Sequence, residues 1–105
     1  MERRVIAGGL YRHYKDKWYF VIGSSVHSET GEAFVTYFPL YLEKVELFIR
    51  PQDMFLEQLP SGTSDLQPWR FQESDSLDLS VKEKVQLLKR ADHLLKSLGL
   101  AILPE

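Results

Sequence analysis

Two runs rich in aromatic and β-branched residues, 18–26 and 33–41, flank one short polar segment and constrain the fold more than any other feature of the chain. Residues of these types favour β-strands. The polar segment, HSETGE at 27–32, carries a glycine near its end, as tight hairpin turns often do. We therefore expect a long β-hairpin with Gly31 in the left-handed region of backbone conformation.

Shorter segments on both sides of the hairpin extend the β pattern. An alternating stretch begins at Leu10, a regular apolar and polar alternation covers Val45–Arg50, and a short aromatic run begins at Trp69. Pro51 ends the second of these and precedes a stretch compatible with one helical turn. The sequence therefore predicts a mainly β fold: a small, SH3-like, partly open barrel of about five strands.

The periodicity of apolar residues changes near the C-terminus. Ser80 and Glu83 have the spacing of a capping box, apolar residues then recur at helical intervals, and Gly99 suits the end of a helix. We expect residues 1–79 to form the barrel and residues 80–105 to form an amphipathic helix packed on it. If the apolar face of this helix stayed exposed, it would make copies of the protein associate. A homodimer through the helix is therefore the alternative to a monomer. Asp92 and Lys96 are expected to form an exposed ion pair.

Composition limits the kinds of protein that this chain can be. Its 105 residues suit one domain, and the absence of cysteine excludes disulfides and thiolate metal sites and fits a cytoplasmic protein. No apolar run reaches 18 residues, so no membrane-spanning helix or signal peptide is expected. The net charge of −2 does not favour nucleic-acid binding, and no cofactor is implied.

Four blocks of sequence, in order, resemble a known family. They are GLYRHYK at 9–15, HSETGE at 27–32, IRPQDMFLE at 49–57 and WRF at 69–71, and they are similar to the small bacterial domain family of unknown function numbered 1653. The resemblance covers about residues 8–72 and implies a compact SH3-like barrel, without a known activity. Asp16 replaces a usual turn glycine, Phe38 replaces a polar or basic residue, and the C-terminal helix lies outside the pattern.

The polar residues of the hairpin turn and of the neighbouring blocks predict a binding module. Arginine can clamp a carboxylate or phosphate with two hydrogen bonds, although Arg50 could equally pair with Glu29 or Glu57. The expected ligand is a small anion or a peptide-like molecule, and a protein partner is also possible. The residues assigned to the site are His13, Lys15, His27, Ser28, Glu29, Thr30, Arg50 and Met54.

Other functions stay open from the sequence. A small hydrolytic or metal-assisted enzyme would use His27 and Glu29 as acid–base groups or ligands, but no nucleophile elbow surrounds Ser28. Because His13 and His27 share no short ligand motif, no metal site is assigned. Single-stranded nucleic acid could bind to the aromatic residues. The plainest alternative is that His27 and Glu29 only satisfy backbone groups of the turn.

Overall fold

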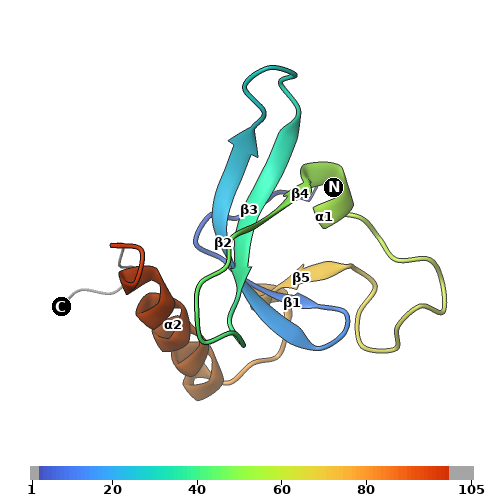
Figure 1. Cartoon of the computed structure of the whole chain (residues 1–105). Coiled ribbons are helices and arrows are strands. Elements are labelled where there is room, and N and C mark those ends of the chain that lie inside the picture. Colours follow the sequence, from blue (N-terminus) through green and yellow to red (C-terminus); the bar gives the residue numbers. More distant parts are fainter. Residues whose placement is uncertain (1–2, 100–105) are drawn as a thin grey trace.

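The computed structural model describes residues 3–99, in which five antiparallel strands form one open sheet with the order β4-β3-β2-β1-β5 (Figure 1). The strands are β1 (Leu10–His13), β2 (Lys17–Val26), β3 (Ala33–Pro39), β4 (Phe48–Pro51) and β5 (Phe71–Glu73). Three helical segments complete the fold: α1 (Gln52–Phe55), the 3-10 turn η1 (Ser74–Ser76) and α2 (Val81–Lys96). The mainly β class with one C-terminal helix is confirmed. Residues 100–105 of the predicted helical region lie outside the described residues.

The predicted hairpin is the pair β2 and β3, which projects from the rest of the molecule as a long arm (Figure 1). Gly31 has φ of +76°, so the expected left-handed turn position is confirmed. The pairing register of the two strands shifts between Val21 and Gly23. A shift of this kind bends and twists a strand locally, and Gly23, a residue type that permits such a bend, lies at that point.

One core cluster is formed by residues of β1, β2, β3, β5 and α1. It contains the buried residues Tyr11, Val21, Val35, Tyr37, Phe55 and Phe71, which we call the aromatic core. The rings of Phe55 and Phe71 stack with their centroids 4.2 Å apart. Next to them the Arg70 amide donates to the Glu57 carbonyl at 3.2 Å, and Gln58 pairs with Trp69. The segment after α1 is thus tied to the segment before β5, across the space between β4 and β5.

A second core cluster is shared between the sheet and α2. Ala91, Leu94 and Leu95 of the helix pack against four buried residues of the sheet side, Leu10, Phe20, Phe38 and Leu40. The expected capping box is present, since the Glu83 amide donates to Ser80 Oγ at 3.1 Å. Phe38, which departs from the family pattern, is fully buried here. Its ring belongs to the surface that receives the helix.

Strand β4 is shorter than the sequence predicted. The prediction began at Val45, but the strand begins at Phe48, and Ile49 is 64% exposed. Arg90 of α2 donates to the carbonyls of Leu40 and Leu42, at 2.8 and 2.6 Å. Because these bonds hold the chain after β3 against the helix, the chain reaches the edge of β3 only at Phe48.

Two further local expectations are refined by the structure. The Asp92–Lys96 pair forms at 3.0 Å, but Asp92 is only 5% exposed, so the expectation of an exposed pair was wrong for the aspartate. Asp92 follows Ala91 on the helix and lies at the border of the contact with the sheet. Asp16 has φ of +64° in the β1–β2 turn, a conformation that glycine adopts without strain, in keeping with the turn glycine that the resemblance implies at this position.

Candidate functional site

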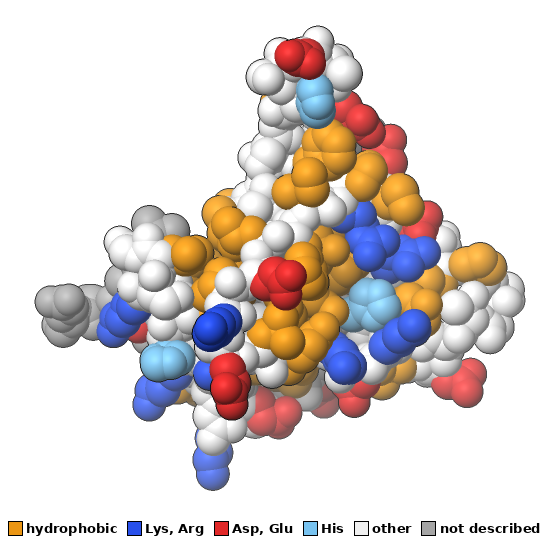
Figure 2. Space-filling model, viewed as in Figure 1, with side chains coloured by type: hydrophobic (Ala, Val, Ile, Leu, Met, Phe, Trp, Pro, Cys, Tyr) orange, Lys and Arg blue, Asp and Glu red, His pale blue; other side chains and the backbone are white. Residues whose placement is uncertain are grey.

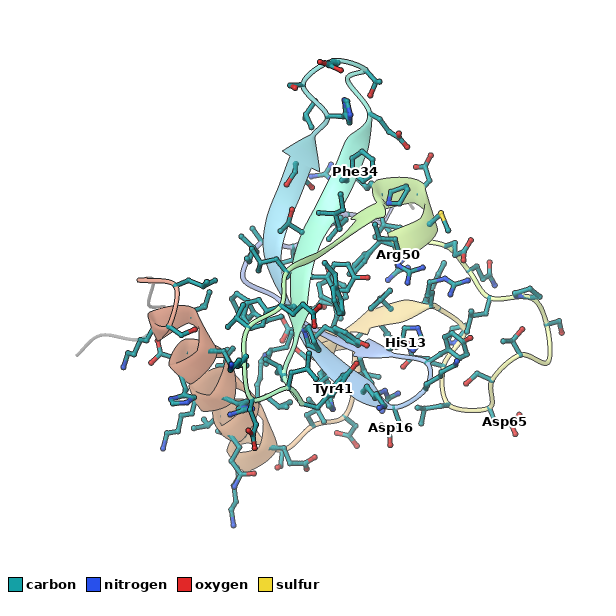
Figure 3. The ribbon with its side chains drawn as sticks, viewed as in Figure 1. His13, Asp16, Phe34, Tyr41, Arg50 and Asp65 are labelled. Atoms are coloured by element: carbon teal, nitrogen blue, oxygen red, sulfur yellow. The ribbon has the colours of Figure 1, made fainter. Side chains whose placement is uncertain are left out.

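Four basic or imidazole side chains from separate segments meet over the aromatic core. His13 ends β1, Lys15 lies in the following turn, Arg50 belongs to β4, and Arg70 directly precedes β5. Figure 3 shows Arg50 and His13 extending into the same space, and Figure 2 shows blue side chains beside a pale-blue histidine on this face. We call these four residues the basic face.

His13 is the central residue of the basic face and is neutral at pH 7. Its ring lies 5.0 Å from that of Phe71, and Nδ1 accepts a hydrogen bond from the Lys15 amide at 3.1 Å. Burial, followed by the positive charges of Arg50, Arg70 and Lys15, lowers the pKa of His13 to about 4. Because Nδ1 accepts, the neutral ring carries its proton on Nε2 and offers a hydrogen-bond donor there.

Arg50 is held in place by neutral partners. Its Nε donates to the hydroxyl of Tyr37 at 3.2 Å, and its Cζ lies 5.7 Å from the ring centroid of Phe71. Within residues 3–99 it forms no ion pair. The sequence left open a pair with Glu57, but that carboxylate binds Arg70. The outer edge of the Arg50 guanidinium is therefore available for a two-point contact with a carboxylate or phosphate.

Arg70 belongs to the basic face but was not predicted as a site residue. It pairs with Glu57 through two guanidinium nitrogens, and its Cζ lies 5.9 Å from the ring centroid of Tyr14. Its only signal in the sequence was its place in the WRF block. Tyr19, whose ring lies 6.2 Å from that of His13, was also not predicted. Arg70 reaches the face through the pairing of β5 with β1, which joins distant parts of the chain, whereas Tyr19 reaches it through the short-range pairing of β1 with β2.

The low pKa of His13 predicts how acid affects stability. Between pH 6.5 and about 4 the unfolded chain binds a proton at this residue and the folded chain does not, so stability falls as the pH is lowered through this range. One pKa unit corresponds to about 1.4 kcal/mol, and after screening by solvent we expect a loss of about 1–2 kcal/mol. Urea unfolding at pH 7 and pH 4 measures the loss, and His13→Asn, whose oxygen can still accept from Lys15, should reduce it. An NMR titration midpoint of His13 near 6.5 would contradict the argument.

The hairpin turn lies apart from the basic face, at the outer end of the β2–β3 arm (Figure 1). His27 Nδ1 accepts hydrogen bonds from the amides of Glu29 and Thr30, both at 3.2 Å, and Thr30 Oγ1 accepts from the Glu32 amide. His27 and Thr30 therefore stabilise the turn itself. Ser28 and Glu29 are exposed.

The structure thus divides the predicted site residues into two groups. It brings together His13, Lys15 and Arg50, with Met54 on the exposed side of α1 four residues after Arg50. It does not bring the turn residues to them. Within residues 3–99 no three side chains of the metal-binding types cluster, and no helix there is long and apolar enough to cross a membrane.

Comparison with known proteins assigns the family. The model of DUF1653, a protein of unknown function, matches residues 9–73. The chain belongs to the DUF1653 family. A crystal structure of a DUF1653 protein from Bordetella bronchiseptica has 30% sequence identity and a TM-score of 0.52 with this chain, and the match covers 63% of this chain and 83% of that one. No curated protein matches.

The DUF1653 match defines which parts of this molecule are family features. The basic face and the whole aromatic core lie within residues 9–73, whereas α2 lies outside. The candidate site and the core beneath it therefore belong to the family domain. The helix that completes the second core cluster lies outside the matched residues.

Proposed function

We propose that this DUF1653 domain is a binding module for a small anion, which the basic face holds through Arg50 and His13. The observation that carries the proposal is the position of Arg50, fixed by the Tyr37 hydroxyl over an aromatic ring and without an ion pair among residues 3–99. An arginine oriented in this way matches the planar geometry of a carboxylate or two oxygens of a phosphate.

The surroundings of Arg50 support an anionic ligand rather than a cationic one. The positive charges of Arg50, Arg70 and Lys15 all disfavour a proton on His13, and Glu57 neutralises only Arg70. A bound anion would relieve this excess of positive charge. It would also accept a hydrogen bond from His13 Nε2, as well as those of the guanidinium.

Inorganic phosphate is the simplest probe of this proposal. We expect phosphate to shift the amide resonances of the basic face in NMR spectra and to raise the pKa of His13 above its value of about 4. Arg50→Gln should weaken phosphate binding about tenfold or more, because a hydrogen bond to a charged group contributes roughly 1.5–3 kcal/mol. Isothermal titration or the NMR shifts give the affinity.

The matched control is Lys89→Gln, which removes one positive charge from the exposed side of α2. It should leave phosphate binding within about twofold of the unmodified protein, since exposed charges at a distance are screened. Equal losses in the two variants would mean that phosphate responds only to net charge. That result, or a complete absence of phosphate binding, would contradict the proposed function.

A further inference from the structure

A hollow of about 330 Å³ lies between the sheet and α2, and none of the four residues of the basic face lines it. Its apolar wall consists of Trp18 from β2, Leu40 and Tyr41 from the segment after β3, and Leu87 from α2. The volume falls in the range of small-molecule sites, which are lined mainly by apolar and aromatic side chains. The hollow therefore has room for the apolar part of a ligand.

Tyr41 connects this hollow to the basic face. Its hydroxyl lies 3.2 Å from that of Tyr19, and the two ring centroids are 5.9 Å apart. The ring of Tyr19 in turn lies 6.2 Å from that of His13. Figure 3 shows Tyr41 and His13 on the same side of the molecule, and in Figure 2 an apolar strip adjoins the basic side chains there. A molecule of two rings could therefore reach from the basic face to the hollow.

The charged groups around the hollow favour a ligand that is negative at one end. Lys17 Nζ lies 4.4 Å from the ring centroid of Tyr41 and has no carboxylate partner within residues 3–99. The Arg90 guanidinium donates to two backbone carbonyls, so it is part of the wall. Asp16 is the one carboxylate at the hollow. Arg50 also forms no ion pair within residues 3–99, and it lies close enough to Tyr19 for its charge to act on that side chain.

We propose that the ligand of the basic face is a small amphipathic anion: Arg50 and His13 hold its carboxylate or phosphate head, and its flat apolar body lies over Tyr19 and Tyr41 and ends in the hollow. This inference rests on the proposed function and adds the chemical class of the ligand. A flat aromatic body is favoured because the strip is made of tyrosine rings, which contact other rings well through their edges and faces.

Three small probes separate the head from the body. They are acetate, which has only the head, (6-iodonaphthalen-2-yl)methanol, which has only the two-ring body, and 6-iodo-2-naphthoate, which has both. Burial of the rings should make 6-iodo-2-naphthoate bind about ten- to hundredfold more tightly than acetate. The iodine should also quench the fluorescence of Trp18, measured in a Trp69→Phe variant because the chain has two tryptophans. The indole N–H resonance of Trp18 in the unmodified protein reports the same contact.

Two variants locate the two ends of the probe. Tyr41→Ala should lower the affinity for 6-iodo-2-naphthoate to near that for acetate and leave acetate binding unchanged, because Tyr41 is 49% exposed and would contact only the body. Arg50→Gln should weaken both anions. The matched control is Leu66→Ala, which removes another exposed apolar side chain, 45% exposed in the loop before β5, and should change neither affinity.

The outcomes separate this inference from the proposed function. Equal binding of acetate and 6-iodo-2-naphthoate at the basic face, without a response of Trp18, would overturn the amphipathic ligand and leave anion binding intact. Equal binding of the alcohol and the naphthoate would also overturn the inference, because the hollow would then act without Arg50. Failure of acetate, 6-iodo-2-naphthoate and phosphate to bind would overturn both.

Discussion

A chain that ends after Leu79, and therefore lacks α2, is expected to aggregate or to be unfolded at room temperature. The helix packs on four side chains of the sheet side that are buried in the complete protein, Leu10, Phe20, Phe38 and Leu40. Each such side chain contributes about 1.5–3 kcal/mol when it leaves water, so their exposure removes roughly 6–12 kcal/mol. A domain of this size has about 5–15 kcal/mol in total. Circular dichroism and light scattering of the shortened protein measure the effect.

A point variant at the centre of the contact tests the same argument within the full chain. Leu94 is 2% exposed, and Leu94→Ala should reduce the free energy of unfolding by about 2–5 kcal/mol. Val81, on the same helix, is 81% exposed, so Val81→Ala should change it by less than about 0.5 kcal/mol. A shortened chain that stays monomeric with an unchanged melting temperature would show that α2 contributes nothing to the core.

Phe71→Ala is expected to have the second large effect, because this side chain supports both the core and the site. Phe71 is 1% exposed, and its ring stacks on Phe55. Truncation of a buried phenylalanine costs about 3–5 kcal/mol. The same ring lies under His13 and Arg50, at 5.0 and 5.7 Å. We therefore expect loss of stability in urea unfolding together with weaker phosphate binding.

Two substitutions separate these effects of Phe71. Phe71→Leu keeps most of the apolar volume, so it should recover much of the stability, while the flat surface under His13 is still lost. Ile49→Ala removes a side chain that is 64% exposed on β4, at the other edge of the sheet, and should be nearly neutral. If Phe71→Ala bound phosphate as well as the unmodified protein does, the ring would have no part in the site.

Local features were predictable because short segments determine them. The left-handed Gly31 and the capping box of Ser80 and Glu83 each depend on residues within a few positions of one another. The start of β4 was mispredicted for the opposite reason. It depends on Arg90, which holds the carbonyl of Leu42 from a helix 48 positions away in sequence.

The basic face required long-range pairing that no local pattern reveals. His13 pairs with Phe71 across β1 and β5, and this register brings Arg70 close to it. The chemistry of their side chains pointed to His13, Lys15 and Arg50 as site residues, but not to how they meet. The concentration of polar residues at the turn was weaker evidence for a binding site, because the side chains of His27 and Thr30 accept hydrogen bonds from the backbone of the turn itself.

The position of α2 in the chain has a consequence for how the protein is made. Every strand of the sheet leaves the ribosome before the helix does, and the face formed by Leu10, Phe20, Phe38 and Leu40 has no cover until the helix follows. At about 5–20 residues per second, the 23 residues between the end of β5 and the end of α2 take roughly one to five seconds to synthesise. During that interval the nascent chain presents an apolar surface of the kind that chaperones bind.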